Sequence, residues 1–185
     1  MNLIKRIARV IKNRKRMDSQ MEDRLSRGLK VGENTHIFSW EGIDANWPWL
    51  ISIGDGVTIS SNVQILAHDA STNKVGCRTK LGRVTIGDNV FIGARSVILC
   101  NTRIGDNVVI GAGSVVSRDC EPNSVYAGNP ARKICTIEEY RAKHEKGRST
   151  RPDLSIIRRW DDWNNATDKE KQQMIELLSD GCGYI

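Results

Sequence analysis

A six-residue repeat is the feature that most constrains the fold of this 185-residue chain. Aliphatic residues recur every six positions, except between Ile65 and Ile86, where the spacing is 21, or three repeats plus three residues. A period of six fits a parallel β-helix in which three hexapeptides complete one turn. The repeat therefore predicts an all-β solenoid, with one segment that leaves the coil at the interruption. The repeated positions are Ile53, Ile59, Ile65, Ile86, Ile92, Ile98, Ile104, Ile110 and Val116.

The first and fifth positions of each hexapeptide are predicted to point into the coil, because side chains alternate along a short strand. Gly-Asp or Gly-Ala pairs at the second and third positions are predicted to make the corners, where backbone freedom is wanted. A leucine-rich repeat is disfavoured because its period is longer than six residues. A β-sandwich is disfavoured because its strands would not keep a six-residue spacing over successive repeats. The residues at the fifth position are small or β-branched, which suits a narrow interior: Val57, Val63, Val90, Ser96, Thr102, Val108, Ser114 and Cys120.

The positive charge of the chain is concentrated at its N-terminus. Residues 1–16 contain seven Lys or Arg and no acid, which leaves 28 − 7 = 21 basic against 22 acidic residues elsewhere. Ile4, Ile7 and Ile11 share a helical face in this segment. It is either an interfacial helix on anionic lipid or a helix that packs on its own coil or a neighbouring subunit.

The sequence also bears on the location of the protein and on its partners. The basic segment lacks the apolar core of a secretory signal, and no stretch is long enough to span a membrane. The cations are local and no recognition motif accompanies them, so we expect no nucleic-acid partner. Five cysteines without a CxxC pair indicate reduced thiols. We expect a cytoplasmic protein, with peripheral contact at the inner face of the membrane as one reading of residues 1–16.

Three regions follow from the pattern. Residues 1–30 are predicted to form a basic helical extension, and residues 31–135 the β-helix, with a polar loop over residues 69–83. Residues 136–185 are predicted to form a helical C-terminal extension. Thr136 is predicted to begin a helix there as N-cap, with Glu139 completing a capping box, and a second capped helix is predicted from Thr167. A solenoid needs covered ends, and such helices can cap it.

His68 stands where the repeat is interrupted. A neutral imidazole suits removal of a proton from a hydroxyl, because its ordinary pKa lies near the working pH. His36 lies in an early repeat and His144 in a segment predicted to be an exposed helix. Cys77 lies in the same loop as His68, but nothing in the sequence activates its thiol. His68 is therefore the predicted general base, and the alternative is a loop histidine without a role.

These residues resemble the hexapeptide-repeat acyltransferases, in particular the maltose and galactoside O-acetyltransferase branch and its surface-polysaccharide members. The resemblance extends over residues 31–135 and includes a coil ending that reads Gly-Asn-Pro-Ala. The segments that carry it are Ile86–Gly93, Ile110–Val116, Ala127–Arg132, Pro48–Ile51 and the pair His68-Asp69.

The resemblance implies a left-handed β-helix and a homotrimer, with each active site in a groove between two subunits. It implies acetyl-CoA as the donor, no metal, and a sugar or sugar conjugate as the acceptor. The predicted function is acetyl transfer to a sugar hydroxyl in polysaccharide or glycoconjugate biosynthesis, with His68 as the catalytic base.

Acceptor contacts are predicted beside His68. Asp44 or Asp69 would orient the imidazole or bind the sugar, although Asp69 is equally a turn residue. Trp47 and Trp49 would stack on a sugar face or plug the interior of the coil. We expect at least one of these two indoles to plug the interior.

Donor contacts come from matching positions of the family. Small residues at the corners let the CoA arm approach the coil, and Arg132 and Lys133 would meet the CoA phosphates. Ala94 stands where relatives have a serine, so one polar contact is absent. The matching positions are Gly93, Ala94, Gly111, Ala112 and Ser117.

Three other functions remain open at this stage. A serine or antibiotic O-acetyltransferase would use the same scaffold and base. A non-catalytic β-helix binding protein would need no loop histidine. A β-helical carbonic anhydrase would need three converging histidines, and it is disfavoured because His144, one of only three histidines, lies beyond the coil.

Overall fold

The computed structural model describes residues 16–156, 165–179 and 181–184. The chain divides into two compact units, Met1–Ile137 and Glu138–Ile185. The first unit contains the hexapeptide repeats and is described first. The predicted amphipathic face of the N-terminus falls on residues 1–15, which lie outside the described residues.

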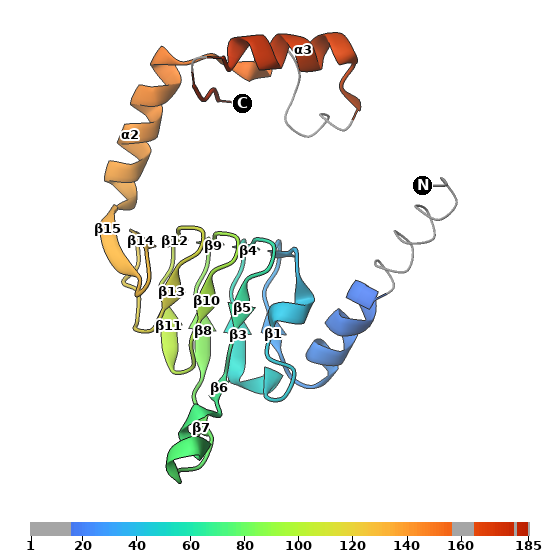
Figure 1. Cartoon of the computed structure of the whole chain (residues 1–185), viewed down its shortest axis with the longest axis vertical. Helices are drawn as coiled ribbons and strands as arrows, with labels where there is room; N and C mark the ends of the chain where they lie inside the picture. The colour runs from blue at the N-terminus through green and yellow to red at the C-terminus, as the bar shows by residue number, and fades with distance from the viewer. Residues whose placement is uncertain (1–15, 157–164, 180, 185) are drawn as a thin grey trace. The chain divides into compact units, whose positions relative to one another are not determined.

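Three parallel sheets form the body of the first unit (Figure 1). The first contains β1 (Lys30–Val31), β3 (Ile51–Ile53), β8 (Val84–Ile86) and β11 (Thr102–Ile104). The second contains β2 (His36–Ile37), β4 (Thr58–Ile59), β9 (Phe91–Ile92), β12 (Val109–Ile110) and β14 (Ser124–Ala127). The third contains β5 (Gln64–Ile65), β10 (Val97–Ile98) and β13 (Val115–Val116). From β3 to β13 the chain visits the three sheets in turn, so each set of three hexapeptides stacks on the previous one.

Equivalent repeat positions lie above one another in this coil. Ile53 pairs with Ile86, and Ile86 with Ile104. All nine repeated aliphatic side chains are at most 4% exposed, and so are all eight residues at the fifth position. Burying each aliphatic side chain stabilises the fold by about 1.5–3 kcal/mol. The predicted parallel β-structure and its interior are confirmed by the strand pairing and by this burial.

The corners differ from the prediction. The backbone turns left-handed at the fourth position of the repeat, as at Asn89 (φ 53°) and Gly113 (φ 70°), and not at the glycine of the second position. The second position needs glycine for space instead. A Cβ on Gly54 would lie 2.2 Å from Asp88 Oδ1, and one on Gly87 would lie 2.1 Å from Asp106 Oδ1. Close stacking of successive turns therefore selects the glycines, and Asn or Gly at the fourth position supplies the conformational freedom.

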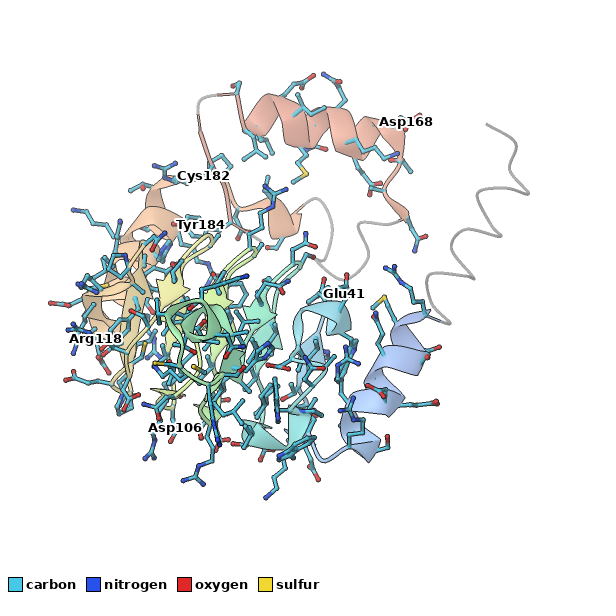
Figure 2. All side chains as sticks on the ribbon, turned by 60° about the horizontal axis from the view of Figure 1, so that its bottom comes forward. Glu41, Asp106, Arg118, Asp168, Cys182 and Tyr184 are labelled. Carbon is cyan, nitrogen blue, oxygen red and sulfur yellow. The ribbon has the colours of Figure 1, made fainter. Side chains whose placement is uncertain are left out.

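Aspartates at the third position join successive turns at one corner. Asp88 Oδ1 accepts the N–H of Asp55, and Asp106 Oδ1 accepts the N–H of Asp88, both at 2.9 Å. Figure 2 labels Asp106 at this edge of the coil. Each carboxylate pairs a corner N–H of the preceding turn, so the Gly-Asp pair serves packing and hydrogen bonding together.

The interruption of the repeat is a hairpin that leaves the coil between β5 and β8 (Figure 1). Strand β6 (His68–Asp69) pairs antiparallel with β7 (Lys80–Leu81), and the 3-10 helix η3 (Ser71–Val75) lies at its tip. The long spacing therefore accommodates a protruding loop without disturbing the stacking of the turns on either side.

Short helices accompany the N-terminal end of the coil. Residues 16–26 form a helix, and the 3-10 helices η1 (Trp40–Gly42) and η2 (Pro48–Leu50) lie between β2 and β3. At the other end, β15 (Arg132–Thr136) pairs antiparallel with β14.

The second unit is mainly helical. It contains most of α2 (Ile137–Thr150), η4 (Leu154–Ile156) and α3 (Asp168–Leu177). The predicted capped helix start at Thr167 is confirmed: Thr167 and Glu170 form a capping box at the start of α3, immediately before Asp168 (Figure 2). The N–H of Leu154, in η4, donates to the carbonyl of Tyr184 at 2.6 Å, which joins the segment after α3 to η4. Within the described ranges, no helix is long and apolar enough to cross a membrane.

Candidate active site

His68 lies at the base of the hairpin, where the chain leaves the coil. It follows Ala67, which is fully buried, and the Gly82 N–H donates to the Ala67 carbonyl at 3.0 Å across the base. The imidazole itself is 26% exposed. The backbone of His68 is thus fixed by the coil, while part of its side chain remains accessible to a substrate.

Asp44 reaches His68 from the segment between β2 and β3. The N–H of Asp44 donates to the Ile65 carbonyl at 2.9 Å, and Ile43 forms a parallel bridge with Ile65. These contacts place the segment beside β5, the strand that comes directly before the hairpin in the chain. They bring the Asp44 Oδ2 to 2.5 Å from the His68 Nδ1.

The Asp44 carboxylate is fully buried and accepts four hydrogen bonds. Its Oδ1 accepts the N–H groups of Asn46 and Trp47, and its Oδ2 accepts the Ala67 N–H and the His68 Nδ1–H. Burial raises the pKa of this carboxyl, but the hydrogen bonds from His68 and the backbone outweigh burial and hold the pKa below its ordinary value. Asp44 is therefore ionised at neutral pH.

An ionised Asp44 fixes the tautomer of His68. Because a carboxylate only accepts hydrogen bonds, the His68 Nδ1 carries the shared proton. The Nε2 is then unprotonated and can accept a proton from another molecule. This is the arrangement that a histidine base requires.

Trp47 forms one wall of the dyad. Its ring centroid is 4.6 Å from that of His68, with the ring planes at 56°. Trp47 also packs partly buried against the core, whereas Trp49 is 52% exposed and does not plug the interior. Of the two tryptophans singled out in the sequence, Trp47 is thus the one beside His68.

Asp69 is placed as a turn residue at the start of the hairpin tip. Its Oδ1 accepts the N–H of Ser71 at 2.9 Å, and this contact with Ser71 holds the pKa of Asp69 below its ordinary value. The carboxylate is exposed beside the hairpin strands. The structure therefore assigns the orienting hydrogen bond on the imidazole to Asp44 rather than to Asp69.

Four of the five predicted donor residues lie along another edge of the coil, and Ser117 follows β13 at the next corner. Ala94 follows β9 and Ala112 follows β12, and the N–H of Gly113 donates to the Ala94 carbonyl at 2.9 Å. Ala112 is exposed and Ala94 is partly exposed, so the edge is open to solvent at two small side chains, and the exposed Arg95 directly follows Ala94. The five residues are Gly93, Ala94, Gly111, Ala112 and Ser117.

Comparison with known proteins supplies the family. The family model described as bacterial transferase hexapeptide (six repeats) matches residues 83–118. Protein CapG of Staphylococcus aureus is 43% identical over 128 residues, which cover 66% of this chain and 74% of CapG. The chain belongs to the hexapeptide-repeat transferases. The predicted class, an acyltransferase that uses acetyl-CoA, is confirmed at the level of this family.

Two solved structures show the likeness in three dimensions. The hexapeptide-repeat acetyltransferase VCA0836 of Vibrio cholerae, complexed with acetyl coenzyme A, is 28% identical with a TM-score of 0.53. A galactoside acetyltransferase in complex with coenzyme A is 31% identical with a TM-score of 0.50. Each match covers 60% of this chain, and 61% and 66% of the two structures. The transferase therefore spans somewhat less than two thirds of each solved relative.

Cations gather where the coil of this transferase ends. Arg132 and Lys133 lie in β15, and Lys133 Nζ is 2.9 Å from the Glu121 carboxylate. Arg132 and Lys133 line a cavity of about 120 Å³ together with Arg118, which Figure 2 labels at this end of the coil. Arg118 was missed in the sequence, although it directly follows the predicted donor residue Ser117.

The remaining candidate groups are dispersed. In the parts of the chain that the structure describes, no group of three His, Cys, Asp or Glu is placed to hold a metal ion. His36 is exposed in β2, and His144 lies in α2 of the second unit. Burial raises the pKa of the Cys120 thiol to about 12, so this cysteine is an apolar filler of the interior, as predicted.

Proposed function

We propose that this transferase moves an acetyl group from acetyl-CoA to a sugar hydroxyl, in polysaccharide or glycoconjugate biosynthesis. The observation that carries the proposal is the Asp44–His68 dyad at the open base of the hairpin. A hydroxyl acceptor needs a base, whereas a binding protein on the same scaffold would not need an oriented imidazole. The likeness to a galactoside acetyltransferase supports a sugar as acceptor.

The dyad performs two proton transfers in this reaction. The His68 Nε2 takes the hydroxyl proton as the sugar oxygen bonds to the acetyl carbonyl carbon, and Asp44 stabilises the imidazolium that forms. The tetrahedral intermediate then collapses and the carbon–sulfur bond breaks. The imidazolium returns its proton to the departing sulfur, which leaves as the CoA thiol. Base catalysis of this kind contributes ~10²–10⁴-fold in rate.

The acceptor is proposed to lie between Trp47 and the hairpin. The indole of Trp47 beside His68 offers an apolar face, on which the C–H face of a sugar ring stacks. Asp69 is exposed on the hairpin strand that begins at His68, and its carboxylate would accept hydrogen bonds from further sugar hydroxyls.

The donor is proposed to lie along the edge that contains Ala94, Ala112 and the neighbouring glycines, and to reach Ser117 at the next corner. Small side chains there leave room for the pantetheine arm. Arg132 and Lys133 would pair with the CoA phosphates at the end of the coil. Acetyl-CoA and coenzyme A in the two solved relatives support a donor site on this scaffold.

We further infer a left-handed coil and a homotrimer in the cytoplasm, since the hexapeptide repeat and the family support both. The basic residues 1–16 would then attract an anionic membrane surface, each cation contributing about 1 kcal/mol. A lipid-linked sugar at the inner membrane face would be a suitable acceptor for a protein docked in this way.

Release of the CoA thiol from acetyl-CoA tests the acceptor class. The purified protein is assayed with free sugars, nucleotide sugars, lipid-linked sugars, serine and chloramphenicol, and the products are examined for O-acetyl groups. We expect acceptor-dependent release with at least one sugar class, and its loss in His68→Ala. Faster transfer to serine or chloramphenicol would overturn the sugar assignment, and no transfer to any acceptor would overturn the enzymatic proposal.

A further inference from the structure

Two arginines, Arg24 in the helix of residues 16–26 and Arg27 just after it, contact the segment that carries Asp44. We propose that Arg24 and Arg27 are positioning residues for acyl transfer: they fix the segment that carries Asp44, and through Asp44 they orient His68. This inference rests on the proposed function, since it assigns the support of the same base. It gives the N-terminal extension a role in the chemistry.

The end of the helix determines where the arginines point. Gly28 is left-handed (φ 98°), its N–H donates to the Leu25 carbonyl, and the N–H of Leu29 donates to the Arg24 carbonyl. This pair of bonds is a Schellman motif, in which a glycine ends the helix and the next residue anchors it. Leu29 is 4% exposed and packs in the core of the coil. The last turn of the helix is therefore attached to the coil, with Arg24 in that turn and Arg27 directly before Gly28.

Arg24 is held inside the protein. Among the residues that the structure describes, the buried charged side chains are Arg24 and Asp44. Arg24 Nε donates to the Ile43 carbonyl at 3.2 Å, and its Nη1 lies 2.6 Å from the Asp23 carboxylate. A buried guanidinium is costly compared with an apolar side chain of similar size. Its hydrogen bond to Ile43, the residue directly before Asp44, therefore indicates a role beyond filling space.

Arg27 binds the two carbonyls that follow Asp44 in the chain. Its Nη1 donates to the Ala45 carbonyl at 2.6 Å and its Nη2 to the Asn46 carbonyl at 3.2 Å. The planar fork of a guanidinium matches two successive carbonyls, which a single ammonium cannot do. Asp23 also lies 3.6 Å from Arg27, so one carboxylate braces both arginines.

The segment is thus fixed from two sides. The arginines hold the carbonyls before and after Asp44, and the coil holds its N–H through Ile65. The Asp44 Oδ1 accepts the N–H groups of Asn46 and Trp47, which belong to the turn that Arg27 grips. If that turn loosens, the carboxylate loses two of its donors and its aim at His68. Misplacing a reacting group by about 1 Å can cost ~10²-fold in rate.

Kinetics of four variants test this inference on a soluble acceptor. Arg27→Met should lower kcat by about 10-fold or more, because both carbonyl contacts are lost. Arg27→Lys should fall between it and the wild type, because one contact can be remade. Arg24→Met should behave like Arg27→Met if it folds. Arg16→Met, at an exposed arginine of the same helix, is the matched control and should leave kcat unchanged. The KM for acetyl-CoA should stay constant throughout.

A double-mutant comparison shows whether the arginines act through Asp44. In an Asp44→Asn background, Arg27→Met should lower kcat by less than about twofold more, because the group it supports is already lost. Independent, multiplicative losses would overturn the inference. So would a folded Arg27→Met protein with wild-type kcat. Arg27 is partly exposed, so this variant keeps the test available even if Arg24→Met does not fold.

Proton NMR supplies a readout that needs no acceptor. The Nδ1–H of His68 in its short bond to Asp44 should give a downfield resonance in the wild type and in Arg16→Met. In Arg27→Met it should broaden or move upfield. An unchanged resonance would contradict the positioning role. If no sugar is acetylated and the resonance still responds to Arg27→Met, only the proposed function fails.

Discussion

Asp44 and His68 share a 2.5 Å hydrogen bond although 24 residues separate them in the chain. One comes from the irregular segment between β2 and β3, and the other from the base of the hairpin that leaves the coil. The coil brings the two together through Ile65, the last residue of β5, which lies three residues before His68 in the chain. The Ile65 carbonyl accepts the Asp44 N–H and so holds Asp44 beside this part of the coil. A rigid repeat thus supplies the geometry of a site that lies outside the repeat.

Replacing Asp44 should damage turnover much more than replacing Asp69. In Asp44→Asn the amide can donate to His68 and stabilise the wrong tautomer, so kcat should fall by ~10²–10⁴-fold. Asp69→Asn should raise the acceptor KM and change kcat only slightly. Steady-state kinetics of both variants provide the comparison. A larger loss of kcat in Asp69→Asn would reverse the two roles.

Acid should remove a specific part of the stability. Hydrogen bonds from His68 and the backbone outweigh burial and hold the pKa of Asp44 below its ordinary value of 3.8 in the folded protein. This carboxylate therefore stabilises the fold fully when the pH is above 3.8. The contribution is lost as the pH falls through the lower folded pKa, where Asp44 takes up a proton. Urea unfolding of the wild type and Asp44→Asn should differ most at neutral pH and converge in strong acid. A difference that is independent of pH would contradict this assignment.

Two glycines of the repeat should respond differently to alanine. A Cβ on Gly87 would lie 2.1 Å from Asp106 Oδ1 and 2.9 Å from the Asp106 N, so Gly87→Ala should lower the free energy of unfolding by about 1–3 kcal/mol or more. Gly113 has open space around its Cβ position but a φ of 70°, so Gly113→Ala should lower it by about 1 kcal/mol. Urea denaturation measures both. An equal or reversed order would show that space is not the constraint at the second position.

Removing the two cations at the end of the coil should weaken donor binding. Arg132→Met with Lys133→Met should raise the Kd for CoA, and added salt should raise it in the wild type. CoA without its 3′-phosphate locates the contact, because the double variant should lose its preference for the complete molecule. Calorimetry measures these affinities. An unchanged Kd for CoA in the double variant would show that its phosphates lie elsewhere.

The repeat was predictable because alternation and stacking are local rules that act on every turn. The error at the corners came from assigning backbone freedom to the frequent glycine, although Asn62, Asn89, Asn101 and Asn107 mark the left-handed position in the same sequence. The packing constraint on the second position depends on the neighbouring turn, so no single hexapeptide reveals it.

The site was only partly predictable for a related reason. His68 stood out because it interrupts a pattern, but the orienting role of Asp44 depends on a segment with no repeat to place it. Arg24 and Arg27 bind backbone carbonyls, and every residue has a carbonyl, so the sequence contains no partner that identifies them.

The central claim is that His68 is the general base, and the turnover of His68→Ala tests it most directly. With acetyl-CoA and the best acceptor, kcat should fall by about 100-fold or more while the Kd for acetyl-CoA stays the same, because a base acts in the transition state. Circular dichroism of the variant serves as the control for folding. A folded His68→Ala protein that keeps more than about a tenth of the wild-type kcat would contradict the account.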